Sequence, residues 1–212
     1  MTMFTYEYEK LPTKVFGLKY VPLLNKYSMD TDLPPVRLPR LKKVIGNDFT
    51  QLNQDVLIEE MHRLGDNLKC ILEIGLSPEE KNGSSFVILE NKPKDAVYLG
   101  VDVSNKSWVT KYENANFLQT TTADRPSVLQ SLKSAGCEKI DLLFIDGWHS
   151  VNMMLTDWLY TSLLSEHGTV LIHDISVHPG PVLIYEAIDE AVFDKVKYES
   201  HDDWGIGVAR RK

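Results

Sequence analysis

The sequence has few cysteines, no long apolar run and no excess of positive charge. Cys70 and Cys137 are the only cysteines among 212 residues, so a framework of several disulfides cannot hold the chain together. Both sit beside apolar runs, which predicts small packing residues rather than nucleophiles. Nowhere do about 18 apolar residues follow one another, and the start lacks a basic and then apolar signal peptide. A soluble, cytoplasmic protein without a membrane partner is therefore expected.

The charge balance and the glycine pattern each argue against one class of ligand. The formal net charge is −7 at pH 7, whereas a nucleic-acid-binding face requires clustered positive charge. No nucleic-acid partner is expected. A dinucleotide-dependent dehydrogenase would carry the pattern G-x-G-x-x-G after its first strand, and the segment beginning Gly75, Leu76 and Ser77 does not supply it.

The prolines and aromatic residues near the start of the chain predict a separate segment. Of the 10 prolines, half lie in the first forty residues, which also lack sustained periodicity. Residues 1–48 are therefore predicted to form an arm or lid, followed by one domain over residues 49–212. The arm is rich in aromatic side chains, so we expect it to pack on its own subunit or to build a homo-oligomer with a neighbour.

Apolar runs alternate with helical periodicity over the rest of the chain. The expected strands cover residues 70–74, 97–103, 117–119, 140–145, 169–172, 196–199 and 206–209. The expected helices lie near residues 48–65, 84–90, 106–112, 126–135, 151–164 and 182–191. This alternation predicts an α/β fold with a doubly wound, mostly parallel seven-stranded sheet. The last two strands follow each other without a helix, which predicts an antiparallel terminal hairpin.

Ligands of such sheets bind beyond the carboxyl ends of the strands, so the residues there are the first candidates for a site. After the first strand, Gly75 follows Glu73, and the next helix opens with hydroxyl residues that include Ser85. Asp102 follows the second strand, where a carboxylate can accept hydrogen bonds from both hydroxyls of a ribose. A helix cap or loop residue is the commoner role of a lone aspartate, but Glu73 at the preceding strand end favours the ribose. Asp124 follows the third strand and could hold the adenine end of a nucleotide or cap the next helix.

Ionisable residues gather after the fourth and fifth strands. Asp146 ends one run, and His173 with Asp174 ends the other, so these side chains should converge if the strands are neighbours. Carboxylates suit Mg²⁺, Mn²⁺ or Ca²⁺, and a ligating imidazole would favour Mn²⁺ or Fe²⁺. His149 lies where it could take a proton from a substrate hydroxyl, with an ordinary pKa of ~6.5. The alternative is that these residues only cap helices and bond loop backbone.

Five segments together resemble a known family. ILEIG, YLGVDVS, LLFIDGWHSVNMMLTDW, GTVLIHDIS and WGIGVARR, in this order, resemble class I S-adenosylmethionine-dependent methyltransferases related to the macrocin-type O-methyltransferases, and more distantly catechol O-methyltransferase. The resemblance covers residues 68–211. It implies donor contacts by Glu73, Gly75, Ser85, Asp102 and, more weakly, Asp124. It also implies metal ligation by Asp146, Asp174 and His173, with His149 as the base.

Two departures accompany this resemblance. Seven residues (LSPEEKN) separate Gly75 from Gly83, where the family has three, and His173 stands where relatives often carry an acidic residue. The predicted function is S-adenosylmethionine-dependent O-methylation of a small hydroxylated molecule, assisted by a divalent metal such as Mg²⁺ or Mn²⁺. The alternatives are a binding or assembly protein with a catalytically altered methyltransferase fold, and a metal-dependent hydroxylase-like relative.

Overall fold

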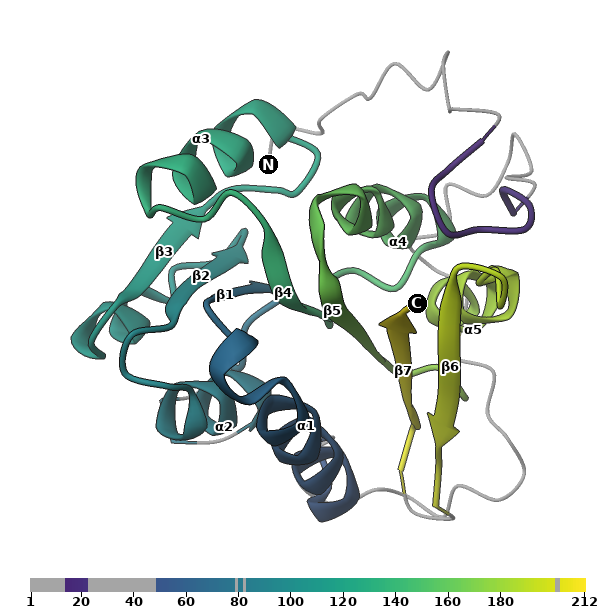
Figure 1. The fold of residues 1–212 in the computed structure, drawn as a ribbon, viewed down its shortest axis with the longest axis horizontal. Coiled ribbons are helices and arrows are strands. Elements are labelled where there is room, and N and C mark those ends of the chain that lie inside the picture. Colours follow the sequence, from purple (N-terminus) through teal and green to yellow (C-terminus); the bar gives the residue numbers. More distant parts are fainter. Residues whose placement is uncertain (1–13, 23–48, 79, 82, 201–202) are drawn as a thin grey trace.

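A single seven-stranded sheet forms the centre of the molecule (Figure 1). The computed structural model describes residues 14–22, 49–78, 80–81, 83–200 and 203–212. Across the sheet the strand order is β3-β2-β1-β4-β5-β7-β6. The strands are β1 (Cys70–Ile74), β2 (Val97–Asp102), β3 (Ala115–Gln119), β4 (Ile140–Ile145), β5 (Leu164–His173), β6 (Phe193–Tyr198) and β7 (Ile206–Arg211).

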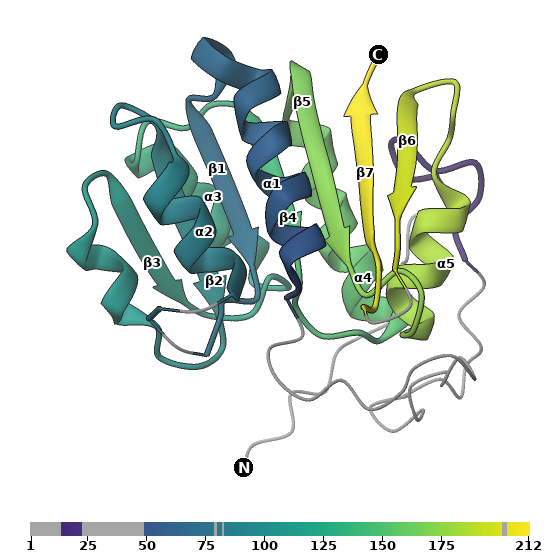
Figure 2. The same ribbon diagram turned by 90° about the horizontal axis from the view of Figure 1, so that it is seen from below.

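Helices cover both faces of the sheet (Figure 2). One face carries α1 (Gln51–Leu64) and α2 (Gly83–Asn91), and the other carries α3 (Arg125–Ser134), α4 (Val151–Trp158) and α5 (Pro179–Ala187). Strands β1 to β5 pair in parallel, while β7 runs antiparallel to both β5 and β6. The predicted doubly wound sheet with a terminal hairpin is confirmed. In the described segments no helix is both long and apolar enough to cross a membrane.

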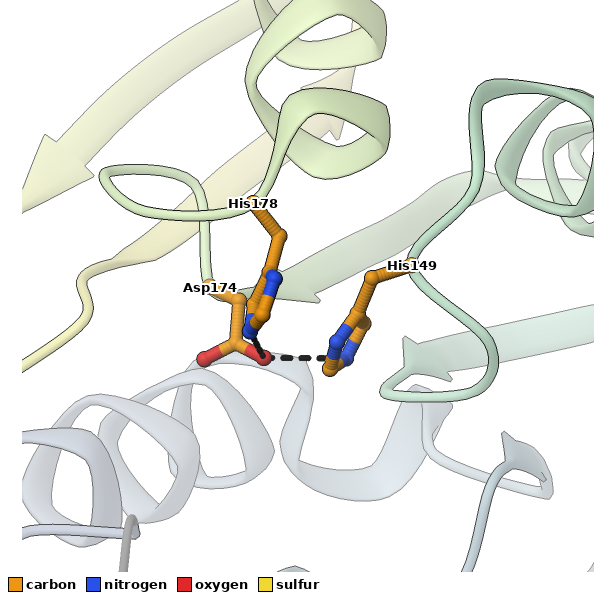
Figure 3. Close-up of side chains that lie close together, drawn as sticks. All are labelled: His149, Asp174 and His178. Carbon is orange, nitrogen blue, oxygen red and sulfur yellow. Dashed lines mark ion pairs between the residues drawn. The ribbon is translucent and has the colours of Figure 1, made fainter. Parts of the chain in front are cut away.

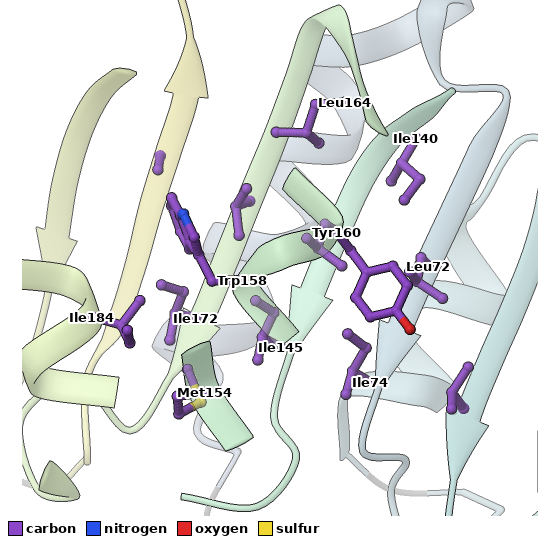
Figure 4. Close-up of a cluster of buried hydrophobic side chains, with 14 of the residues drawn as sticks. Leu72, Ile74, Ile140, Ile145, Met154, Trp158, Tyr160, Leu164, Ile172 and Ile184 are labelled. Carbon is purple, nitrogen blue, oxygen red and sulfur yellow. The ribbon is translucent and has the colours of Figure 1, made fainter. Parts of the chain in front are cut away.

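Alternating residues of the central strands feed two separate cores. Leu72 of β1 packs into the cluster beneath α3, α4 and α5, whereas its neighbour Ile71 packs into the cluster beneath α1 and α2. Figure 4 shows the first cluster, in which Met154 and Trp158 of α4 lie over Ile172 of β5. Strands covered on both faces read as continuous apolar runs, which is why β1 and β4 were located to the residue from the sequence.

Three predicted elements have different bounds or character. The predicted helix over 151–164 ends at Trp158 and continues as the 3-10 helix Leu159–Leu163, because Leu164 already pairs with Ile140 as the start of β5. The first half of β5 contains exposed polar residues, so the apolar run predicts only its second half as a strand. The segment predicted as a helix over 106–112 forms the 3-10 helix Ser107–Lys111.

Part of the predicted arm packs on its own subunit. The indole nitrogen of Trp158 donates a hydrogen bond to the Phe16 carbonyl at 2.9 Å, and the Phe16 ring contacts Phe193 edge-on. Leu18 forms an isolated antiparallel bridge with Ile188. The rest of the arm, residues 1–13 and 23–48, lies outside the described residues. Its roles as a lid and as an oligomer contact stay predictions.

The two cysteines form a disulfide with a Cα–Cα distance of 5.7 Å. Both are buried in the core, as expected of packing residues, but the bond between them is not predicted from the sequence. The pairing of β1 with β4 brings them together, since Cys70 begins β1 and Cys137 lies in the turn just before β4. A separation of 67 residues hides this proximity in the sequence.

Candidate active site

The strand register gathers four predicted site residues along one edge of the sheet. Ile74 of β1 pairs with Val101 of β2 and with Ile145 of β4, which in turn pairs with Ile172 of β5. Because parallel strands end at the same edge, the next residue of each strand belongs to a common row. That row consists of Asp102, Gly75, Asp146 and His173.

A cavity of about 370 Å³ opens beyond this edge. Its walls come from the loops that follow β1, β2, β3 and β4 and from the helix α4. The lining residues are Ile74, Gly75, Leu76, Val101, Asp102, Val103, Thr120, Thr121, Thr122, Asp146, Gly147, Trp148, Met153 and Asp157. The cavity therefore takes in three residues predicted from the sequence, namely Gly75, Asp102 and Asp146. Trp148 stands at its rim with 58% of its surface exposed.

Gly75 lets the loops after β1 and β4 meet at the floor of this cavity. Its φ angle is +78°, in the left-handed region that favours glycine. Its N–H donates to the Val101 carbonyl at 3.0 Å, and the Asp146 N–H donates to the Ile74 carbonyl at 2.8 Å. A Cβ atom on residue 75 would overlap the carbonyl oxygen of Asp146. A side chain at this position is therefore incompatible with the observed packing.

Asp102 shapes the opposite wall. Its Oδ2 accepts from the Leu76 N–H at 2.9 Å, and its Oδ1 accepts from the Ser104 N–H at 2.6 Å. These bonds tie the loop after β1 to the end of β2. Each carboxylate oxygen can accept more than one hydrogen bond, so both can also receive hydroxyl groups from the cavity. Asp102 does not cap a helix, since the N-cap of the following 3-10 helix is Lys106.

Glu73 and Ser85 lie beneath the cavity rather than in its lining. Glu73 Oε1 accepts from the hydroxyls of Ser84 at 2.6 Å and Ser85 at 3.0 Å, and Oε2 accepts from the Tyr98 hydroxyl. Burial raises the pKa of the Glu73 carboxyl to about 7, although the three hydroxyl donors work in the opposite direction. This network fixes the start of α2. It also holds the loop between β1 and α2, in which Gly75 and Leu76 line the cavity.

The long loop between Gly75 and Gly83 is closed by paired serines. The Ser77 N–H donates to Ser85 Oγ at 2.9 Å, and the Ser85 N–H donates back to Ser77 Oγ at 3.2 Å. Asp124, predicted as a weak contact to a nucleotide, is instead the N-cap of α3, where it accepts from the Ser127 N–H at 3.4 Å. Asp124 does not line the cavity.

A cluster of carboxylates and imidazoles lies beside the cavity. His173 Nδ1 is 3.2 Å from Asp146 Oδ1 and 3.1 Å from Asp174 Oδ1. His149 Nε2 is 2.9 Å from Asp174 Oδ2 and 3.8 Å from Asp146 Oδ1 (Figure 3). The structure thus brings together the four residues that the sequence placed after β4 and β5.

These contacts set the protonation of the cluster. Burial disfavours a charged imidazole, but the carboxylates of Asp146 and Asp174 prevail and raise the pKa of His149 to about 10 and of His173 to about 9. Burial also works to raise the pKa of Asp146, yet the two imidazoles hold it at about 2. These contacts favour the protonated imidazole at neutral pH for both histidines. The ordinary pKa of ~6.5 expected for His149 from the sequence is therefore too low.

His178 belongs to the cluster and was missed by the sequence reasoning. Its ring stacks on His149 with a centroid distance of 4.1 Å, and its Nε2 is 3.9 Å from Asp174 Oδ2 (Figure 3). It is the N-cap residue of α5, and the Gly180 N–H binds the His149 carbonyl at 3.1 Å. The available signal was its spacing of four residues from Asp174, which is weak without the knowledge that the chain turns there.

The cluster has the donor atoms that a divalent cation requires. Two groups of three residues place one ligand atom each within 4.8 Å of one another: Asp146 with His173 and Asp174, and His149 with Asp174 and His178. His149 Nε2 and Asp174 Oδ1 are buried and contact other members of the cluster, so a bound cation would replace the ion pairs that these two atoms make. A mixed nitrogen and oxygen set suits Mn²⁺ or Fe²⁺ better than Mg²⁺.

Asn53 of α1 supports the first of these groups from the other side. Its side-chain amide is 3.1 Å from His173 Nε2, and both residues are buried. Holding the second ring nitrogen of a histidine is how proteins orient an imidazole toward a metal. Asn53 therefore keeps His173 Nδ1 directed at the two carboxylates.

Comparison with known proteins agrees with this geometry. Residues 72–175 match the family model described as "Methyltransferase domain", a range that runs from β1 through the residues just after β5 and includes the cavity and most of the cluster. This segment of the chain is therefore similar to a methyltransferase domain. Solved O-methyltransferase structures share its fold, which agrees with the expected resemblance to the macrocin-type O-methyltransferases. No curated protein matches it in sequence.

Solved structures share the fold at low sequence identity. MycE methyltransferase from the mycinamycin biosynthetic pathway, in complex with Mg, S-adenosylhomocysteine (SAH) and mycinamycin VI, is 13% identical with a TM-score of 0.53. The match covers 74% of this chain but 48% of MycE, so the chain spans about half the length of that protein. CalS11, a TDP-rhamnose 3'-O-methyltransferase of calicheamicin biosynthesis, is 10% identical with a TM-score of 0.54 over 76% of this chain and 81% of CalS11. An rRNA methylase from Streptococcus thermophilus is 12% identical with a TM-score of 0.52, over 80% of this chain and 99% of the methylase.

Proposed function

We propose that this chain transfers the methyl group of S-adenosylmethionine to a hydroxyl oxygen of a small molecule. The observation that carries the proposal is the double position of Asp146, which lines the cavity and also belongs to the ionisable cluster. A donor in the cavity and a hydroxyl at the cluster would meet at this residue. Such alignment of two reactants is a large part of what a methyl-transfer enzyme must supply.

The cavity fits the donor through Asp102 and Gly75. The Asp102 carboxylate would accept the two ribose hydroxyls, and the glycine backbone would let the methionine end approach the floor. Val103 and Met153 offer apolar surface for the adenine. Glu73 and Ser85, which the resemblance implied as donor contacts, would act by holding the loop after β1. The MycE structure contains SAH, the product of such a donor.

A divalent cation would be held by Asp146, His173 and Asp174. Such an ion, when bound, favours the deprotonated form of an acceptor hydroxyl. The MycE complex contains Mg, whereas His173 in this chain supplies a nitrogen ligand. We therefore favour Mn²⁺ over Mg²⁺ for this site.

His149 would act as the base that removes the proton of the acceptor hydroxyl. Its Nε2 faces the cluster from the loop before α4, beside the cavity wall formed by Trp148. A base requires a neutral imidazole, and the carboxylates that now raise the pKa of His149 are the same groups that would ligate the cation. If the two carboxylates bound a cation, they would stabilise the imidazolium less, and the pKa of His149 would fall toward its ordinary value.

The acceptor is proposed to be a small hydroxylated molecule in the cytoplasm. The net charge of −7 disfavours RNA, although one structural neighbour is an rRNA methylase. The exposed Trp148 at the cavity rim provides a flat surface for a ring. The arm over residues 1–48 would close over the acceptor or join subunits of a homo-oligomer.

Calorimetry with S-adenosylmethionine and SAH tests the donor site. Wild-type protein should bind both, and Asp102→Asn should weaken both by about tenfold or more, because a charged acceptor is lost. Asp141→Asn is the matched control, since Asp141 is buried at the other end of β4 and accepts from the Lys69 and Cys70 N–H groups. Absence of binding by the wild-type protein would overturn the proposed function.

A further inference from the structure

The imidazole rings of His149 and His178 stack on each other beside the ionisable cluster (Figure 3). Their centroids are 4.1 Å apart, and the two ring planes differ by 26°. The two residues belong to different loops, since His149 precedes α4 and His178 is the N-cap of α5. The stack therefore joins the loop that follows β4 to the loop that follows β5.

The turn after β5 brings the His178 ring to this position. Asp174 has a φ angle of +63°, and its carbonyl accepts from the N–H groups of Val177 and His178, both at 3.2 Å. This tight turn places His178 Nε2 3.9 Å from Asp174 Oδ2. The Trp204 ring also contacts the His178 ring in a T-shaped arrangement, with the centroids 5.4 Å apart. His178 is thus supported by its own turn and by a second aromatic residue.

The backbones of the two loops are joined at the same place. The Gly180 N–H donates to the His149 carbonyl at 3.1 Å. A Cβ atom on residue 180 would overlap this carbonyl oxygen, so the close approach requires glycine. The backbone bond fixes the main chain of His149 but leaves the rotation of its side chain open. The ring stack restricts that rotation.

The ion pairs of His149 cannot orient its ring in the state in which it would act as a base. In these pairs Nε2 lies 2.9 Å from Asp174 Oδ2 and 3.8 Å from Asp146 Oδ1. A base must carry a free lone pair on Nε2, and a neutral nitrogen of this kind does not attract a carboxylate oxygen, because both atoms are acceptors. The same two carboxylates are also the proposed ligands of the cation. The stack depends on neither condition, since it is a contact between flat ring faces.

We propose that His178 is the positioning residue of the base, because its ring keeps the neutral His149 imidazole in one orientation with Nε2 toward the cluster. The inference rests on the proposed function, since it gives His178 a part in the reaction only if His149 removes the acceptor proton. It assigns His178 no contact with the methyl donor, and His178 does not line the donor cavity.

Nuclear magnetic resonance of the His149 side chain tests this inference in protein saturated with SAH and Mg²⁺. Mg²⁺ is the probe because it is diamagnetic and prefers carboxylate oxygens to imidazole nitrogens. In the wild type, the three-bond couplings across χ1 of His149 should correspond to a single staggered rotamer. In His178→Ala they should average over several rotamers. Without Mg²⁺ the ion pairs remain, so the same variant should show less averaging.

Two further variants separate the stack from other effects. His178→Phe keeps a flat ring but has no ring nitrogen, so it should restore the single rotamer of His149. His167→Ala removes an exposed histidine of β5 and should leave the couplings of His149 as in the wild type. By calorimetry, His178→Ala should bind SAH within about twofold of the wild-type affinity, because the two sites share no contact.

Each contrary result has a distinct meaning. A single His149 rotamer in His178→Ala with SAH and Mg²⁺ overturns the positioning role and leaves the proposed function intact. Averaging that persists in His178→Phe also overturns it, because a ring nitrogen rather than the stacked face would then hold His149. A large loss of SAH affinity in His178→Ala assigns His178 a general structural role instead. Failure of the wild-type protein to bind SAH overturns the proposed function, and the role of His178 in the reaction with it.

Discussion

The backbone of Gly75 lies so close to Asp146 that a methyl group on residue 75 would overlap the Asp146 carbonyl oxygen. We predict that Gly75→Ala lowers the free energy of unfolding by more than about 2 kcal/mol, because left-handed strain and a backbone clash add together. Gly136→Ala is the matched control: its φ is +84°, but nothing lies near its would-be Cβ. In that variant the free energy of unfolding should fall by only about 1 kcal/mol. Equal losses in chemical denaturation would contradict the close approach.

The buried Glu73 should make stability depend on pH. Its folded pKa of about 7 is above the unfolded value of 4.5, so between these values the unfolded chain releases the proton more readily and stability falls as pH rises. Glu73→Gln cannot ionise and keeps a similar shape. We predict that the variant has a higher Tm than the wild type at pH 8, with a smaller or reversed difference at pH 4.5. The exposed Glu138→Gln serves as the control, and a constant difference across pH would contradict the burial effect.

His149→Ala should separate turnover from donor binding. Loss of a general base typically lowers turnover by about 10²–10⁴-fold, whereas the donor contacts proposed here do not involve this side chain. The measurement is kcat for methyl transfer beside the Kd for SAH. His167→Ala, which alters an exposed histidine of β5, should change neither quantity. Parallel losses of kcat and affinity in His149→Ala would remove the assignment as base.

Binding of Mn²⁺ should release protons and strengthen as pH rises. Because the pKa of His173 is about 9, a cation that binds its Nδ1 must displace a proton over most of the pH range below that value. We predict weaker Mn²⁺ binding at pH 6.5 than at pH 8.5, and apparent binding heats that differ between buffers of different ionisation enthalpy. Identical heats in all buffers would contradict a histidine ligand.

Variants of the same cluster locate the ion. Asp174→Asn should weaken Mn²⁺ binding by more than about tenfold, because Asp174 contributes to both possible ligand groups. His178→Ala should leave the affinity within about twofold if the ion lies among Asp146, His173 and Asp174. A strong loss in His178→Ala would place the ion at the second group. Retention of a redox-active iron would instead favour the hydroxylase-like alternative.

The strands can be predicted from the sequence because burial on both faces requires a nearly continuous apolar run. The contacts that orient individual side chains cannot be predicted in this way. The runs that form β1 and β4 are apolar except for Glu73 and Asp141, and the sequence predicts the bounds of both strands as observed. Asp102 and Asp146 followed from strand ends alone. Glu73 was expected to contact the methyl donor, but it does not line the cavity. The sequence cannot show that the hydroxyls of Ser84, Ser85 and Tyr98 point toward its carboxylate.

The missed residues are those placed by helix direction. His178 is the N-cap of α5 and Asp157 lies near the end of α4, so each reaches the site through the placement of its helix on the sheet. Asp157 directly precedes Trp158 in the sequence, but this pair does not state which way the carboxylate points. The spacing of Asp124 before Pro126 suits a helix cap as well as a ligand contact, and the cap is what the structure contains.

The strand order divides the site into two parts. The proposed donor wall comes mainly from loops on the β1, β2 and β3 side, while the proton and cation chemistry comes from loops on the β4 and β5 side. The two sides meet at Asp146. Substitutions around His178 and the start of α5 should therefore alter which hydroxyl is presented without changing the part of the chain that would hold the methyl donor.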